Sequence, residues 1–556
     1  MRTDVFTWKE DRPWPNCRLK RGAIVGHTTP HSTKLWLRTG YPGDYQLLLF
    51  PINADSEALR QQLTEVPLKL EDLPDSVRRI PLKVENFDSD TTCVVTIDEL
   101  EPSTEYGYAL HGRDGAIERI VLGQDRPYQF RTLHDDPGAS FSFGFYSCHM
   151  PYKDTMFRKT DIVNQSMWDY FDAALNRQHS RDLRFVIGGG DQVYTDGVDS
   201  LNIWRYLAKV ARKQDGQLLP TKESMVTWYR DIYRGYWGFE NLRQVHSRYP
   251  QYMIWDDHEL GDGWGSYRLS GNQQDELNEL FDYKKAGLTR DEALILIGEM
   301  KKAAFQVYDE YQHAHNPDTP QGQFDYDFRC GRAAFYCLDG RGQRDINRKS
   351  RRVLGIAQYQ RFKRWLEARD PAETPFLFVI SAVPIMHLAT VLANADDTIL
   401  ADIADLQDDL RDSWEHKLHD SERKGLVKML FAAANRGLKI CILSGDVHTS
   451  AAFKMRDPSS GAIMYQLTSS AITYDKSRPL SWVLGKTVSD CGRSVDGYDF
   501  TQLTLYTACN FSIVQVFPEE QTVWFRLYGK QTVSDPKEEA ADLPVNSALT
   551  NLELRF

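Results

Sequence analysis

The sequence predicts an α/β protein preceded by a β-sandwich, and three observations support this fold class. Short β-rich segments alternate with turn residues from Leu19 to about Arg131, a spacing typical of a sandwich. Short apolar runs then alternate with helix-period segments, which is typical of a layered α/β fold. A polar, proline-containing stretch at His134–Gly138 separates the two patterns, as a domain boundary does. We therefore expect domains at residues 1–135 and 136–530, followed by a tail at residues 531–556.

The first domain is predicted from segments that combine branched and aromatic residues and end in turn residues. These segments are Ala23–Val25, Thr33–Arg38, Tyr45–Phe50, Thr92–Ile97, Tyr106–Gly112 and Tyr128–Thr132. In Leu100–Ala109, a proline turn leads into an alternating Tyr-x-Tyr strand, which resembles the end of fibronectin type III domains. We therefore expect a fibronectin III-like or Ig-like sandwich.

The second domain is predicted from short apolar runs of the kind that form buried strands. The expected strands are Phe141–Ser147, Phe185–Ile187, Tyr252–Trp255, Ala334–Leu338, Phe376–Ile380 and Ile440–Leu443, with a closing hairpin of Phe511–Phe517 and Thr522–Tyr528. The helix-period segments are Gln165–Asn176, Ser224–Arg234, Glu292–Tyr311, Ala357–Glu367 and Asp420–Asn435. We also expect helical insertions near residues 201–251 and 265–324, beside the loops that follow the strands.

Composition excludes several classes of protein. Hydrophobic residues make up 41% and charged residues 26%, which is ordinary for a globular chain. No apolar run reaches the ~18 residues of a membrane-spanning helix. The net charge of −11 and the lack of a basic block argue against a nucleic-acid or anionic-membrane partner. The 8 cysteines form no CxxC pair, and charges and prolines occupy the start of the chain, so we expect a reduced, cytoplasmic location.

Residues with metal-binding side chains follow four of the predicted strands, where an α/β sheet binds its ligands. The four segments are Tyr146-Ser-Cys148-His149, Gly188-Gly-Gly-Asp191-Gln-Val-Tyr194-Thr-Asp196, Asp256-Asp257-His258-Glu259-Leu-Gly-Asp262 and Ser444-Gly-Asp446-Val-His448. Carboxylates crowded at one edge repel and desolvate one another, which raises their pKa values. One or two divalent or trivalent cations would lower these pKa values instead. We therefore expect a metal centre at this edge.

Each segment also has a simpler interpretation when it is taken alone. Gly-Gly-Gly-Asp is most often a turn, and with Val193 in place of a third glycine it is a poor dinucleotide fingerprint. His258-Glu259 lacks the second histidine of the zinc-protease motif. A free cysteine such as Cys148 is usually a small core residue. The metal prediction depends on the four segments together.

Together these segments resemble the strand-end motifs of the calcineurin-like metallophosphoesterase superfamily and, more closely, of the PhoD-like (alkaline phosphatase D) family. The resemblance covers most of the chain and implies a four-layer metallophosphoesterase α/β sandwich behind the front domain. The matching segments, in the order of the family, are Val25–Arg38, Phe143–Cys148, Gly190–Tyr194, Trp255–Glu259, Leu338–Arg341 with Leu354–Gln358, and Gly445–His448.

The resemblance implies a set of metal ligands, which are Cys148, Asp191, Tyr194, Asp257, Asp446 and His448. Asp191 would bridge two ions. A tyrosinate and a thiolate favour ferric iron, and the family implies Fe³⁺ at that site. The oxygen-rich site of Asp257 and Asp446 implies Ca²⁺, and other divalent metals are possible. His387 is a candidate for a further family histidine, and Asp262 is either an additional ligand or a plain loop acid.

The function so predicted is a metal-dependent phosphoric ester hydrolase, a phosphatase or phosphodiesterase, in which a metal-bridged hydroxide attacks a phosphate-ester substrate in line. The candidates for contacting the phosphoryl group or assisting the leaving group are His258, Arg230, Arg234 and Arg341. Arginines on a helix are mostly surface or packing residues, which is the simpler reading of Arg230 and Arg234. Two alternatives are a non-catalytic binding protein with a degenerate phosphoesterase domain and metal-dependent hydrolysis of another bond.

Overall fold

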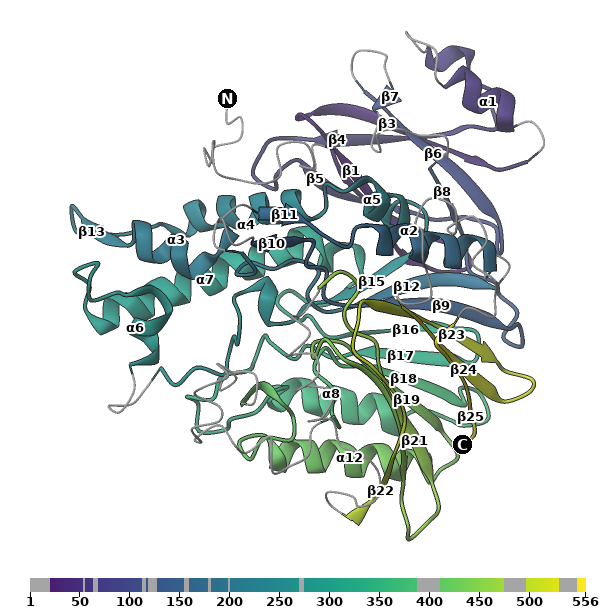
Figure 1. Cartoon of the computed structure of the whole chain (residues 1–556). Helices are drawn as coiled ribbons and strands as arrows, with labels where there is room; N and C mark the ends of the chain where they lie inside the picture. The colour runs from purple at the N-terminus through teal and green to yellow at the C-terminus, as the bar shows by residue number, and fades with distance from the viewer. Residues whose placement is uncertain are drawn as a thin grey trace.

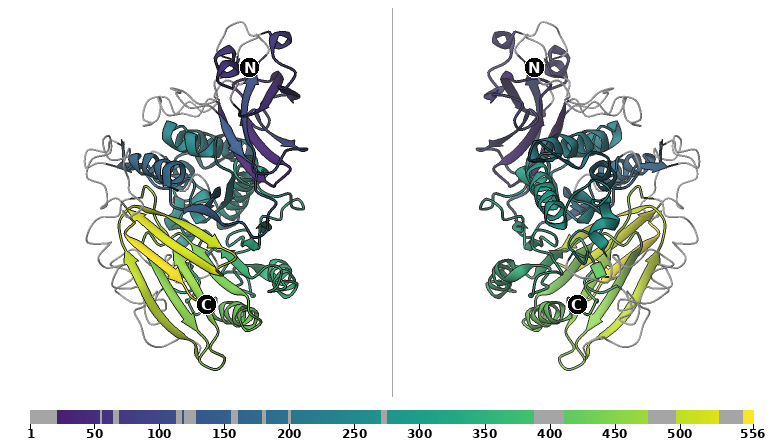
Figure 2. Two further views of the ribbon diagram at one scale, coloured as in Figure 1. Left: turned by 90° about the vertical axis from the view of Figure 1, so that its right-hand side faces the viewer. Right: turned by 90° about the vertical axis from the view of Figure 1, so that its left-hand side faces the viewer.

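The structure is a computed structural model that describes residues 21–53, 56–63, 69–112, 117–118, 128–154, 160–178, 182–198, 201–269, 275–387, 411–474, 497–529 and 548–556. A front β-domain precedes a larger α/β domain (Figure 1). Two further views show the teal helices between the purple front domain and the yellow C-terminal strands (Figure 2).

The front domain consists of two antiparallel sheets that share one core. One sheet contains β1 (Gly22–Thr28), β2 (Thr33–Arg38) and β5 (Thr92–Ile97). The other contains β3 (Gly43–Pro51), β4 (Arg78–Val84), β6 (Glu105–His111), β7 (Ile117–Glu118) and β8 (Gln129–Arg131). Between β3 and β4, the chain forms α1 (Ser56–Gln62) and a 3₁₀ turn at Leu70–Asp72. Val25, Leu35, Leu47 and Tyr108 lie in the shared core, so the two sheets form a sandwich. Its finer likeness to fibronectin III or Ig domains stays a prediction.

The sequence did not predict β4 as a strand. Its segment, Arg-Arg-Ile-Pro-Leu-Lys-Val, contains three cations and a proline, which obscure the usual alternation. The strand lies at one end of its sheet and pairs only with β3. Proline is tolerated on an edge strand because one side of that strand needs no ladder hydrogen bonds.

The α/β domain contains two facing sheets. The first has the order β15 (Gln251–Ile254), β12 (Leu183–Gly189), β9 (Phe141–Tyr146), β23 (Asn510–Phe517), β24 (Thr522–Gly529) and β25 (Thr550–Leu554). The second has the order β16 (Tyr326–Cys330), β17 (Ala333–Cys337), β18 (Phe376–Ile380), β19 (Lys439–Ser444), β21 (Ile463–Thr468), β20 (Ser450–Arg456) and β22 (Asp499–Tyr506). Phe143 packs edge-on against Phe335 and Phe378, with ring centroids 5.3 and 5.2 Å away, so an aromatic core joins the sheets.

Helices cover the outer face of each sheet. Those on the first sheet include α2 (Ser166–Ala173), α4 (Lys222–Tyr236), α5 (Glu240–His246) and α7 (Arg290–Tyr311). Those on the second are α8 (Gly355–Glu367) and α12 (Asp420–Ala434), which Figure 1 shows below that sheet. Two sheets between two helical layers confirm the predicted α/β fold. Among the described residues, no helix is both long and apolar enough to cross a bilayer.

The two predicted insertions contain further elements. Residues 201–251 include α3 (Ile203–Val210) and a short hairpin of β13 (Arg212–Gln214) and β14 (Gln217–Leu219), in addition to α4 and α5. Residues 265–324 include α6 (Glu276–Phe281) and α7. A small hairpin of β10 (Tyr152–Asp154) and β11 (Thr160–Ile162) follows β9.

The prediction of a C-terminal tail is wrong for the end of the chain. Thr550–Leu554 forms β25, which pairs antiparallel with β24. Leu554 is buried in the core between the sheets, and Leu552 and Phe556 pack against that core. Alternate residues of this short segment therefore supply an apolar edge to the first sheet, a pattern too brief to stand out beside the polar residues before it. Residues 530–547 lie outside the described part of the chain.

The front sandwich is joined to the α/β domain through the second face of β1 and β2. Side chains alternate along a strand, so while Val25 and Leu35 fill the sandwich core, Ile24 and Trp36 point the other way. Ile24 and Trp36 belong to the core of the helical layer, and Trp36 Nε1 donates to the Glu310 carbonyl at 2.7 Å. β1 and β2 are therefore buried on both faces.

A buried charge cluster around Asp90 strengthens this junction. Asp90 Oδ2 accepts from Arg38 Nε at 3.1 Å within the sandwich and from the Tyr311 hydroxyl of α7, and Arg234 of α4 lies 3.4 Å from Oδ1. Burial raises the pKa of the Asp90 carboxyl, but Arg234 and Arg38 outweigh it and lower the pKa to about 2. The contribution of this carboxylate to stability is therefore present above about pH 4 and is lost as the pH falls towards 2.

We expect Asp90→Asn to destabilise the folded protein by about 3–5 kcal/mol, because it removes the buried carboxylate that faces two buried guanidinium groups, of which Arg234 keeps a second partner in Asp231. Thermal unfolding at neutral pH measures the effect. The control is Asp318→Asn, which also breaks an ion pair between the domains, with Lys34, but the Asp318 side chain is 93% exposed. An exposed ion pair is worth under about 1 kcal/mol. Equal shifts in melting temperature for the two variants would therefore contradict the role of the buried Asp90 cluster in joining the domains.

Candidate metal centre

The predicted ligands follow strands that end at one edge of the two sheets. β9, β12 and β15 are parallel neighbours in the first sheet, and Cys148, Asp191 and Asp257 follow their carboxyl ends. In the second sheet, Asp446 and His448 follow β19. The thiol of Cys148 lies 3.6 Å from the Asp446 carbonyl, so the strand ends of the two sheets meet.

One group of side chains combines sulfur, oxygen and nitrogen donors. Cys148 Sγ and Tyr194 Oη each lie 3.3 Å from Asp191 Oδ2, and Tyr194 Oη lies 2.9 Å from His448 Nε2. Ligand atoms of Cys148, Asp191 and His448 all lie within 4.8 Å of one another. This set contains the four residues expected around the first metal.

A second group contains only carboxylates. Ligand atoms of Asp191, Asp256, Asp257 and Asp446 also lie within 4.8 Å of one another. Asp191 therefore belongs to both groups, which is the position of a bridging ligand. Asp256 was not predicted as a ligand, although it precedes Asp257 in the same strand-end segment. The two adjacent aspartates were the sequence signal that could have identified it.

The backbone around these ligands is held in unusual conformations. Cys148, Asp191, Asp446 and His448 have φ values of 58°, 56°, 63° and 50°, in the left-handed region that non-glycine residues seldom adopt. Such conformations cost about 1–3 kcal/mol each and cluster at functional sites. Gly445 permits the close approach of the second sheet, because a Cβ there would lie 2.4 Å from the Ser147 Cβ.

Burial and like charges disfavour ionisation of the cluster in the metal-free chain. Burial raises the pKa of Asp191 well above its usual value, and Asp257 and Asp256 raise it further, against the opposing effect of His258. The pKa of Asp446 is raised by burial and then by Asp256. Burial and the Asp191 carboxylate likewise raise the pKa of the Cys148 thiol. A cation among these groups would reverse all three shifts.

The donor atoms fit metal ions. Asp191 Oδ1 is buried and accepts no hydrogen bond from the described residues, so it has an unused lone pair where the two groups meet. A thiolate, a phenolate, an imidazole and a carboxylate suit a transition metal, whereas clustered carboxylates suit a hard divalent cation. The residues present therefore fit two neighbouring cations that share Asp191.

His258 lies beside the cluster with its ring oriented by two neighbours. Its Nδ1 donates to Asp196 Oδ1 at 2.7 Å, and the ring stacks on Tyr194 with centroids 4.0 Å apart. Burial lowers the pKa of His258, but Asp196, Asp257 and Asp191 outweigh burial and raise it well above the usual value. Asp196 was not predicted as a functional residue; its place two residues after Tyr194 was the available signal.

Arg341 lies behind the cluster and is fully buried. Its Nε donates to Asp256, its Nη1 donates to Asp412 at 2.6 Å and its Nη2 lies 3.4 Å from Asp257 Oδ1. Even with this guanidinium, burial raises the pKa of Asp256 to about 7. Arg341 thus binds the carboxylates and holds them in place. The prediction that it contacts phosphate is wrong, because its N–H groups already bind Asp256, Asp257 and Asp412.

The two helix arginines lie at the domain junction instead. Arg230 pairs with Glu310 at 2.6 Å and donates to the Asp88 carbonyl of the sandwich, and Arg234 belongs to the Asp90 cluster. The prediction that Arg230 and Arg234 neutralise a phosphoryl group is therefore wrong. Helical periodicity identified α4, but it could not show which of its faces turns towards the sandwich.

The two remaining candidates occupy different positions. Asp262 forms a third group with Asp196 and His258, with ligand atoms within 4.8 Å of one another. His387 belongs to none of the clustered groups in the described chain; its backbone N–H donates to Glu415, and its ring packs edge-on against Phe453. Another missed residue, Tyr474, stacks on the His448 ring at 3.9 Å, and no strand-end motif signalled it.

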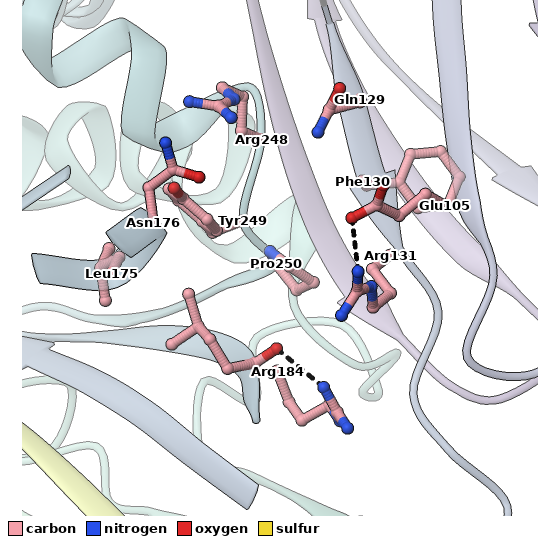
Figure 3. A pocket seen from close by; sticks show the side chains of 11 residues that line it. Glu105, Gln129, Phe130, Arg131, Leu175, Asn176, Arg184, Arg248, Tyr249 and Pro250 are labelled. Atoms are coloured by element: carbon pink, nitrogen blue, oxygen red, sulfur yellow. Dashed lines mark hydrogen bonds and ion pairs between the residues drawn. The ribbon is translucent and has the colours of Figure 1, made fainter. Parts of the chain in front are cut away.

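A separate hollow lies between the domains (Figure 3). The front sandwich contributes Glu105, Gln129, Phe130 and Arg131, and the α/β domain contributes Leu175, Asn176, Leu183, Arg184, Arg248, Tyr249 and Pro250. On the sandwich side of this hollow, the Arg131 guanidinium pairs with Glu105 at 2.6 Å. None of the predicted metal ligands lines this hollow.

Several known proteins are similar to this chain. A model of the PhoD-like phosphatase family matches residues 144–493. A solved structure described as PhoD has a TM-score of 0.58 and 16% identity, and the match covers 93% of this chain and 87% of the other. The structure of purple acid phosphatase PPD1 from yellow lupin (Lupinus luteus) seeds has a TM-score of 0.47 and 11% identity over 92% of this chain and 72% of the other.

A curated relative is the uncharacterized protein YGR266W of Saccharomyces cerevisiae, which is 24% identical over 331 residues. The match covers 49% of this chain and 45% of the relative, so the chain spans less than half the length of that protein. The chain belongs to the PhoD-like phosphatase family, whose model matches more than half of its residues. Two facing sheets with clustered donor groups at their strand ends are the arrangement that the resemblance to this family implied.

We expect cation binding to the metal-free protein to release protons at neutral pH. Burial raises the pKa values of Asp191, Asp446 and Cys148, and a bound cation lowers them again, so each group that binds a cation moves towards its ionised form and gives up a proton. The proton release is measurable with an indicator dye in weak buffer, and the apparent affinity rises with pH. Asp191→Asn is expected to release fewer protons. Binding without proton release would contradict the proposed ligand set.

Proposed function

We propose that the chain is a metal-dependent phosphoric ester hydrolase. The observation that carries this proposal is the convergence of four strand-end segments on Asp191, which belongs both to a mixed donor group and to a carboxylate group. Membership of the PhoD-like phosphatase family supports it. The substrate is a phosphate ester, and a monoester and a diester are both to be assayed.

The proposed metal pair follows from the donor types. Cys148, Tyr194 and His448 would hold Fe³⁺ with Asp191, and Asp191 with the neighbouring carboxylates would hold Ca²⁺. When bound, such ions stabilise charge on phosphoryl oxygens and make water a nucleophile near neutral pH. The described cysteines form no disulfide bond with one another, which supports the proposed cytoplasmic location.

Residues of the chain itself supply orientation and proton transfer. Arg341 and Asp412 hold Asp256 and Asp257 in place, so that these carboxylates do not separate through repulsion. His258 is oriented by Asp196 through Nδ1, which leaves Nε2 for the substrate. A protonated His258, favoured by three surrounding carboxylates, can donate a proton to the leaving-group oxygen.

Asp191→Asn is expected to lower kcat/KM by more than about 100-fold, since even the outer partners of metal ligands contribute 10- to 100-fold. The melting temperature of the metal-free protein should stay the same or rise, because the variant removes a buried carboxylate that its neighbours repel. The assays use a phosphomonoester and a phosphodiester with metal-loaded protein. Unchanged turnover in this variant would eliminate the mechanism, and no turnover by the wild type would favour the binding-protein alternative.

His258→Ala is expected to lower kcat by about 100-fold or more for an alkyl ester, whose leaving group needs a proton. The loss should be smaller for a nitrophenyl ester, whose leaving group departs as a stable anion. Asp196→Asn is the companion variant and should show the same trend with a smaller loss, because it loosens the ring and removes one of the charges that raise the pKa of His258 but keeps the imidazole. Equal losses for both esters would show that His258 does not assist the leaving group.

A further inference from the structure

Glu259 holds the backbone of two ligand segments with one carboxylate. Its Oε1 accepts from the backbone N–H of Gln192 at 2.7 Å, and its Oε2 accepts from the N–H groups of Asp191 at 3.2 Å and Asp256 at 2.8 Å. Glu259 is only 1% exposed. The loop after β12 and the loop after β15 are thus fastened to the same side chain.

Gln312 holds Glu259 from the helical layer. Its Nε2 donates to Glu259 Oε1 at 3.0 Å and to the Tyr233 hydroxyl at 2.9 Å. Tyr233 lies on α4, and Gln312 directly follows α7. Because the preceding residue, Tyr311, donates to Asp90, the end of α7 is fixed to the front sandwich one residue before it contacts Glu259.

The chemistry at Glu259 requires a carboxylate. Three backbone N–H groups and one amide N–H converge on its two oxygens, and every one of them is a donor. An ionised carboxylate offers about four lone-pair sites and no proton, so it can accept all four bonds. A glutamine of the same shape would turn an NH₂ group towards donors at one of the two positions. The arrangement therefore depends on the number of acceptors, and not on side-chain volume.

We propose that Glu259 and Gln312 are positioning residues of the metal centre, which fix the Asp191 and Asp256 loops in the spacing that two cations need. This inference rests on the proposed function for its effect on turnover, but its effect on cation binding does not depend on which bond is hydrolysed. Gln312 supports that spacing because it links Glu259 to α4 and α7. Both of these helices are bound to the front sandwich through Asp90. Both side chains are buried, with exposures of 1% for Glu259 and 0% for Gln312.

The test compares Glu259→Gln and Gln312→Met with a matched control, Glu422→Gln. Glu422 is also buried and also accepts backbone N–H groups, those of Val353 at 2.6 Å and Leu354 at 3.3 Å, but it lies on α12 and contacts no ligand loop. Each protein is stripped of metal and titrated with Fe³⁺ and Ca²⁺ in competition with a chelator. Thermal unfolding, kcat and KM are measured on the same preparations.

We expect Glu259→Gln to weaken cation binding by about 10- to 100-fold, the usual effect of removing an outer partner of metal ligands. Gln312→Met should weaken binding less, because the three backbone hydrogen bonds to Glu259 remain. Saturating cation should restore part of kcat with KM little changed, which sets both variants apart from Asp191→Asn. Glu422→Gln should lower only the melting temperature.

The opposite result is equally clear. Cation affinity and kcat equal to wild type in Gln312→Met, with only a lower melting temperature, would reduce Gln312 to a structural role and overturn the proposal. Gln312 lies outside the ligand loops, so this variant still decides the matter if Glu259→Gln does not fold. If the wild type hydrolyses no phosphate ester, the proposed function fails, but the cation titrations still test the positioning role.

Discussion

Repulsion among buried carboxylates is the constraint on which the rest of the structure depends. Asp191, Asp256 and Asp257 are buried and Asp446 is half-buried, and their ligand atoms lie within reach of one another. Arg341 supplies one fixed positive charge behind them. The remaining like charges help to raise the pKa values of Asp191 and Asp446, and a cation at this edge would reverse both shifts.

That geometry is held by elements that have no chemical role themselves. The aromatic core between the sheets fixes the directions of β9, β17 and β18. Where the strands end, left-handed backbone at Cys148 and Asp191 turns the ligands inward, and this strain persists because the surrounding core and hydrogen bonds over-determine it. Rigid strands thus deliver the ligands, and the short turns after them set the final positions.

The sequence was informative wherever a short apolar run ended in an unusual residue. Cys148, Asp191 and His448 could be found in this way because parallel strands end at one edge of a sheet. Arg230 and Arg341 could not be placed, since the face of a helix and the depth of a loop depend on partners distant in sequence, such as Glu310 and Asp412. The contact between Glu259 and Gln312 was missed for the same reason. Glu259 lies in the strand-end segment after β15, but Gln312 is 53 positions further along the chain and lies in no such segment.

The double burial of the β1–β2 sheet has an evolutionary consequence. A sandwich with one solvated outer face could be exchanged for another module or deleted with little loss. Here Ile24 and Trp36 are part of the interior of their neighbour, so deletion would uncover an apolar surface on the helices. Substitutions on the two sides of this boundary are therefore expected to be accepted in pairs, and the lineage of the front domain should follow that of the metal-binding domain without recombination between them.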